Sequence, residues 1–144
     1  IGLALAGVSA EKRDELSPLM HNVGIAFQIQ DDYLDLVGSE ESTGKPILSD
    51  IKEGQHTLFT RHILDHANPE LRQEFVDLFG KSTDQTKLTA LQTKLIQSGL
   101  LNDGKQQFED LYQTTLLTLE NSDLPPEPKL QLTNLITKLT KRNA

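Results

Sequence analysis

The chain has 144 residues, of which 36% are hydrophobic and 24% charged, and its formal net charge is −7. This length suffices for one domain with its own core, and the acidic balance argues against a general nucleic-acid or anionic-membrane surface. The absence of cysteine excludes disulfides and thiolate metal sites, so we expect a reducing, cytoplasmic location.

The first predicted element is the end of a helix. Residues Ile1 to Val8 are apolar but too few to span a membrane, and they lack the basic flank of a signal peptide. Because the apolar pattern is already under way at Ile1, we expect the chain to be a fragment of a longer protein.

The second predicted element is a long helix over residues 10–37. Ser9 is suited to cap its start and Gly38 to end it. Pro18 lies inside this range, so we expect a kink or a break near Ser17. The Gly-, Ser- and Glu-rich residues 38–46 are typical of a loop.

Shorter helices are predicted for the rest of the chain. Ser49 or Asp50 is suited to cap a short turn that ends before Gly54. Apolar spacing, caps and prolines then predict helices over residues 57–66, 69–79, 88–98, 108–119 and 132–139. No strand-like alternation of useful length is present. We therefore predict an all-α fold, with residues 1–144 forming a single helical domain.

The long helix carries an acidic face near its end. At about 100° per residue, Gln28, Asp31, Asp32 and Asp35 fall within an arc of roughly 100°. Three carboxylates on one face repel one another unless a cation lies among them. Hard oxygen ligands suit Mg²⁺, whose shell is commonly completed by waters and substrate phosphates. The face therefore predicts a magnesium–phosphate site.

The surroundings of this face decide between a cation site and a merely solvated one. Gly24, one turn before Gln28, leaves space beside the acids, and aspartate is a weaker helix former than the glutamate that a solvated face favours. The opposite side of the helix is apolar and expected to pack: Ala26, Ile29, Tyr33, Leu36 and Val37. We favour the cation site.

Lys45 follows in the glycine-containing loop. A lysine there is placed to reach a phosphate that the metal also contacts. Taken alone, the dipeptide Gly44-Lys45 is more typical of a surface charge, so its meaning depends on the neighbouring acidic helix.

The ordered combination of these motifs resembles a known family. Residues 27–35 (FQIQDDYLD), then Gly44-Lys45, then residues 49–54 (SDIKEG), are similar to the second aspartate-rich motif of the trans-prenyltransferases, the polyprenyl (isoprenyl) diphosphate synthases. The resemblance extends over all 144 residues, which correspond to the C-terminal half of the family's chain.

The resemblance implies an all-α bundle around a central cavity, the isoprenoid-synthase fold. Two aspartate-rich motifs would hold Mg²⁺ on an allylic diphosphate, whose ionisation gives a carbocation that isopentenyl diphosphate attacks. Asp31 would be the principal metal ligand, with Asp32 and Asp35 binding directly or through water. Gln28 and Lys45 would contact the diphosphate or stabilise the cation. The full-length enzyme would be a homodimer.

Two departures from the family matter. Gln55 stands where the family usually has a lysine, which removes one cation from the diphosphate side. The first aspartate-rich motif and the arginines for isopentenyl diphosphate are not in this sequence, so we expect the 144 residues alone to be inactive. The alternative function is a non-catalytic helical subunit or interaction module derived from the family. A hydrolase or terpene cyclase on a similar bundle is disfavoured by residues 44–54.

The histidines offer a competing metal site. His62 and His66 are four residues apart with Asp65 between them, a spacing that can form a zinc-binding face on a helix. No third ligand is evident in the sequence, so a surface or half-buried pair is favoured.

Overall fold

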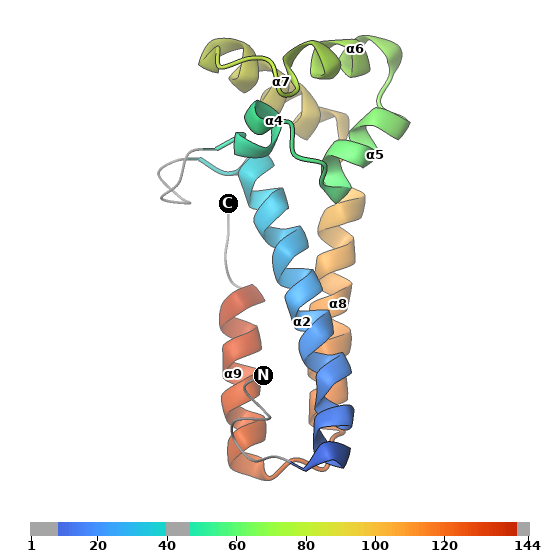
Figure 1. The fold of residues 1–144 in the computed structure, drawn as a ribbon, viewed down its shortest axis with the longest axis vertical. Helices are drawn as coiled ribbons and strands as arrows, with labels where there is room; N and C mark the ends of the chain where they lie inside the picture. Colours follow the sequence, from blue (N-terminus) through green and yellow to red (C-terminus); the bar gives the residue numbers. More distant parts are fainter. Residues whose placement is uncertain (1–8, 40–46, 141–144) are drawn as a thin grey trace. The chain divides into compact units, whose positions relative to one another are not determined.

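A computed structural model describes residues 9–39 and 47–140 (Figure 1). All regular structure in these two ranges is helical, which confirms the predicted all-α fold. The helices are α2 (Ala10–Val37), α4 (Ser49–Glu53), α5 (Leu58–His66), α6 (Pro69–Leu78), α7 (Gln85–Ser98), α8 (Asn102–Glu120) and α9 (Pro126–Thr140). The predicted first helix and Lys45 lie outside the described residues. No helix in the described ranges combines the length and hydropathy needed to cross a membrane.

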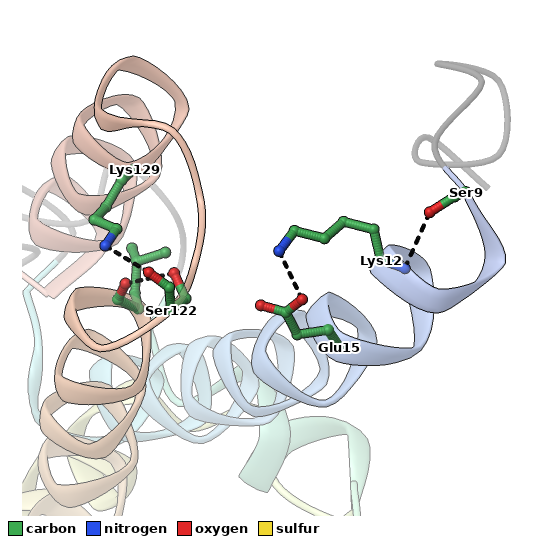
Figure 2. Close-up of polar contacts among 6 residues, drawn as sticks. Ser9, Lys12, Glu15, Ser122 and Lys129 are labelled. Atoms are coloured by element: carbon green, nitrogen blue, oxygen red, sulfur yellow. Dashed lines mark hydrogen bonds and ion pairs between the residues drawn. The ribbon is translucent and has the colours of Figure 1, made fainter.

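Helix α2 has the predicted bounds. Its first turn is capped by Ser9, whose Oγ accepts the amide of Lys12 at 3.3 Å (Figure 2). Of the kink or break expected near Ser17, a break is absent, because α2 continues through Pro18, and the kink stays a prediction. Pro18 has no amide to donate to the carbonyl four residues earlier, that of Asp14. The Ser17 hydroxyl donates to the neighbouring Arg13 carbonyl at 2.6 Å.

Local caps also set the bounds of the helices that follow. Thr57 and Thr60 form a reciprocal capping box at the start of α5. Asn68 accepts the Leu71 amide at 2.9 Å and precedes proline at the first position of α6, as predicted. Gly99, with φ of +76°, ends α7.

The contacts of the chain divide it into two compact units. In the described residues, one unit comprises 9–27 and 108–140, so that it holds the start of α2, most of α8 and all of α9. Its buried hydrophobic side chains come from all three helices: Leu16, Leu19, Val23, Ala26, Phe108, Tyr112, Leu119 and Ile136. At the end of α8, the Lys129 ammonium donates to the Glu120 carbonyl at 2.8 Å. It also donates to the Ser122 carbonyl at 2.7 Å (Figure 2). The predicted single domain stays a prediction.

The second unit comprises residues 28–39 and 47–107 and holds the acidic end of α2. Its hydrophobic core joins Leu36 of α2 to buried residues of α4–α7, among them Ile51, Phe59, Ile63, Phe75, Leu88 and Leu91. Ile29, Tyr33 and Val37 pack against this core, which confirms the expected packed side of the long helix. The acidic face is therefore on a helix fixed by its apolar side.

Candidate functional site

The predicted acidic face lies at the end of α2. Asp31, Asp32 and Asp35 are half-buried, whereas Gln28 is exposed one turn earlier. The Gln28 side-chain amide donates to Asp32 Oδ1 at 2.7 Å. A Cβ built on Gly24 would meet nothing within 4 Å.

Asp35 binds the segment that leads into α4. Its Oδ1 accepts the Ser49 amide at 3.0 Å and the Ser49 hydroxyl at 2.6 Å, and its Oδ2 accepts the Asp50 amide at 3.1 Å. Its backbone carbonyl accepts the Leu48 amide at 2.9 Å. Asp35 thus receives four hydrogen bonds from three consecutive residues.

The prediction that Ser49 or Asp50 caps α4 was wrong. The N-cap residue is Leu48, which has no side-chain capping bond, whereas Ser49 is the first helical residue. Leu48 has φ of +59°, the one positive φ of a non-glycine residue in the described ranges. Such a conformation persists only where surrounding contacts hold it, and here Asp35 binds Leu48 and both residues after it. The cap comes from 14 and 15 residues upstream, beyond the reach of a local pattern.

Carboxylates converge at this point. Burial raises the pKa of the Asp32 carboxyl, and the negative charges of Asp31 and Asp35 raise it further. The hydrogen bond from Gln28 lowers this pKa but does not cancel the increase. Burial raises the pKa of Asp50 to about 6, helped by the negative charges of Asp35, Asp32, Asp31 and Glu53. Asp50 is therefore a fourth carboxylate of the cluster, although its place in the sequence indicated a helix cap and no metal ligand. A cation would relieve this repulsion.

The carboxylates of the cluster fit Mg²⁺ as one or two direct ligands rather than as a set of three. In residues 9–39 and 47–140, no three His, Asp or Glu side chains are arranged to hold a metal ion by themselves. Asp35 binds α4 and Asp32 binds Gln28, so the three acids do not close around one point. Mg²⁺ is commonly held by one or two carboxylates, with waters and phosphates completing the shell. Half-buried carboxylates on an open face suit that role, and the site residues stay a prediction.

Two further side chains shape the site without having been predicted. Ser49 contacts Asp35 as described above. Gln92 of α7 is 9% exposed, and its amide donates to the carbonyls of Leu36 and Gly38 at 3.0 and 3.1 Å. A lone glutamine in an amphipathic helix gives no sequence signal for such a contact.

The other predicted site residues are placed as follows. Lys45 lies outside the described residues. Gln55 is exposed, and its backbone amide donates to the Asp50 carbonyl at 2.8 Å, so it is next to the cluster. The rings of His62 and His66 lie 4.4 Å apart and His62 Nε2 is 3.7 Å from Asp103 Oδ2. Within the described residues these groups do not form a three-ligand metal site.

Comparisons with known proteins agree on one family. A family model described as Polyprenyl synthetase matches residues 1–95. Farnesyl pyrophosphate synthase of Bos taurus is 31% identical over 139 residues, covering 96% of this chain and 38% of that protein. Geranylfarnesyl diphosphate synthase of Aeropyrum pernix is 34% identical over 102 residues, covering 71% of this chain and 31% of that protein.

A solved structure gives the same result. Geranylgeranyl pyrophosphate synthase from Corynebacterium glutamicum, crystallised with isoprenyl diphosphate and magnesium, matches with a TM-score of 0.87 and 30% identity. The match covers 99% of this chain and 41% of that one. The chain spans 38% and 31% of the length of the two curated relatives named above.

Proposed function

Because the chain belongs to the polyprenyl synthetase family of trans-prenyltransferases, we propose that it supplies one wall of a site that joins an allylic diphosphate to isopentenyl diphosphate. The observation that carries this proposal is the half-buried carboxylate cluster at the end of α2, which includes Asp31 and Asp32 and continues to Asp50. Such a cluster suits a divalent cation that also binds phosphate oxygens. The magnesium and isoprenyl diphosphate of the Corynebacterium glutamicum structure support the same ligands.

The residues of this wall have separate roles in the proposal. Asp31 and Asp32 would be the metal ligands, and Gln28 orients Asp32 through its hydrogen bond. Asp35 would contribute through water, because its oxygens already accept bonds from Ser49 and Asp50. Lys45 would contact the diphosphate. Bound Mg²⁺ would supply charge stabilisation for the departing diphosphate.

The apolar side of α2 has its own part in the proposed reaction. Tyr33 and Phe59 lie with ring centroids 5.7 Å apart and fix that side of the helix against the core of its unit. A rigid helix keeps Asp31 and Asp32 in a constant relation to each other, which metal-assisted ionisation requires. The proposed wall is therefore preorganised by packing rather than by the metal.

We further propose that the 144 residues make no product alone and that the whole enzyme is a homodimer. The chain matches 41% or less of the relatives named above, and the rest of their length would supply the facing wall.

The test is an assay with labelled isopentenyl diphosphate and an allylic diphosphate. It compares the 144-residue chain with a longer protein in which an upstream polyprenyl synthetase half precedes it. Product is expected only from the longer protein, and Asp31→Asn should remove at least about 99% of that activity. An Asp31→Asn enzyme of nearly full activity would refute the site, whereas product from the 144 residues would refute the inactivity.

A further inference from the structure

We propose that Gln92 and Ser49 are positioning residues for the acidic face. Gln92 fixes the last turn of α2, and Ser49 fixes the carboxylate of Asp35 on that turn. This inference rests on the proposed function, because it concerns the same wall of the same site.

Gln92 supplies partners that α2 cannot supply itself. The last carbonyls of a helix have no following turn to donate to them, and buried carbonyls need a partner. The Gln92 amide reaches Leu36 and Gly38 from 56 and 54 residues away. Gly38 has no positive φ, so the glycine does not end α2 in the left-handed conformation that the sequence favours. The long-range amide takes the place of that local cap.

Two other carbonyls of the last turn also have partners. Leu34 accepts the Gly38 amide at 2.9 Å, and Asp35 accepts the Leu48 amide at the same distance. The turn that carries Asp35 is therefore bound by its own helix, by the residue before α4 and by α7. Among the described residues, Gln92 is the side chain that donates to these carbonyls, so its loss leaves two of them without that partner.

Ser49 acts on the side chain of Asp35. Its hydroxyl and its backbone amide both donate to Oδ1, at 2.6 and 3.0 Å. With the Asp50 amide on Oδ2, these donors fix the plane of the carboxylate and leave about one of its four lone pairs available to water. Metal sites depend on placement within about 0.5 Å, so we infer that both contacts act on ligand binding as well as on stability.

The test uses the isotope-labelled 144-residue chain and inorganic pyrophosphate with Mg²⁺ as the probe, followed by NMR. Gln92→Met keeps length and removes the donor, and Ser49→Ala removes only the hydroxyl. Each should weaken pyrophosphate binding by about three- to tenfold. The matched controls are Gln97→Met, an exposed glutamine of the same helix, and Ser49→Thr, which retains a hydroxyl. Both controls should bind like the original chain.

A second readout separates positioning from unfolding. Amide exchange at Gly38, Ser49 and Asp50 should accelerate in Gln92→Met and Ser49→Ala, while circular dichroism shows the chain still folded. If Gln92→Met does not fold, the Ser49→Ala and Ser49→Thr pair decides. Folded variants that bind pyrophosphate as tightly as the original chain overturn the inference alone. An original chain that shows no Mg²⁺-dependent binding overturns the proposed function, and the inference with it.

Discussion

Gly54 and Gly80 meet backbone to backbone, since a Cβ built on Gly54 would lie 3.2 Å from the Cα of Gly80. Gly54 has φ of +69° and ends α4, and the Gly80 amide donates to the Ile51 carbonyl at 2.8 Å. A side chain at position 54 would be strained by its backbone conformation and by this approach. The helix that binds Asp35 is therefore held at both ends, by Asp35 at its start and by Gly80 at its end.

Gly54→Ala should consequently destabilise the chain by about 1–3 kcal/mol, measured by urea unfolding. Gly24→Ala is the matched comparison, because Gly24 lies within α2 with nothing within 4 Å of its added Cβ. That substitution should stabilise by about 0.5–1 kcal/mol. Equal effects of the two substitutions would contradict the close approach at Gly54.

Gly104 is a second position that excludes a side chain, for a different reason. A Cβ there would clash with Cε1 of Phe59, a core residue that is 1% exposed. Gly104→Ala should cost about 1–3 kcal/mol through overpacking. In the double variant with Phe59→Leu, the alanine should cost less, because the smaller side chain vacates the space. A cost that is unchanged by Phe59→Leu would show that another neighbour opposes the added methyl.

The parts of the fold that the sequence predicted are those governed by local pattern. The Ser9 start of α2, the Asn68-Pro69 start of α6 and the Gly99 end of α7 all follow from residues within one turn of the boundary. Of the kink or break expected near Ser17, the break was wrong, since a long helix continues past one missing amide donor at Pro18.

The site was less predictable because its contacts are long-range. The acidic face followed from helical periodicity, but the attachment of Asp35 to Ser49 spans 14 residues and the Gln92 contacts span more than fifty. Leu48 at an N-cap with positive φ contradicts local preference altogether. Such a residue is held by the tertiary structure, so no pattern in its neighbours marks it.

Asp50 should make the stability of the chain depend on pH. Its pKa of about 6 in the folded chain lies above that of an unfolded aspartate, about 3.9. The folded state therefore binds the proton more tightly, and Asp50 favours the fold below pH 4 and loses this contribution as pH rises through 6. Asp50→Asn should raise the melting temperature at pH 7.5 in EDTA but change it little at pH 4.5. Solvent screening limits the gain to about 1–2 kcal/mol.

The control for this prediction is Asp123→Asn, which removes an exposed carboxylate from the other compact unit. Its effect should be small at both pH values. Mg²⁺ should oppose the pH effect, because a cation favours ionised carboxylates. If Asp50→Asn and Asp123→Asn shift the melting temperature alike at pH 7.5, the carboxylate repulsion at Asp50 is not present in solution.

Gln55 offers the final prediction, because it is next to the cluster and neutral. Its backbone amide donates to the Asp50 carbonyl, and its exposed side-chain amide donates to Glu53. Gln55→Lys places a cation beside the proposed diphosphate site, and it should tighten Mg²⁺-dependent pyrophosphate binding by about two- to fivefold. The gain should shrink from 50 mM to about 500 mM salt, since the new charge is exposed. Gln97→Lys on α7 adds the same charge elsewhere. If both lysines tighten binding equally, the pyrophosphate responds to net charge alone, and the site does not extend to residue 55.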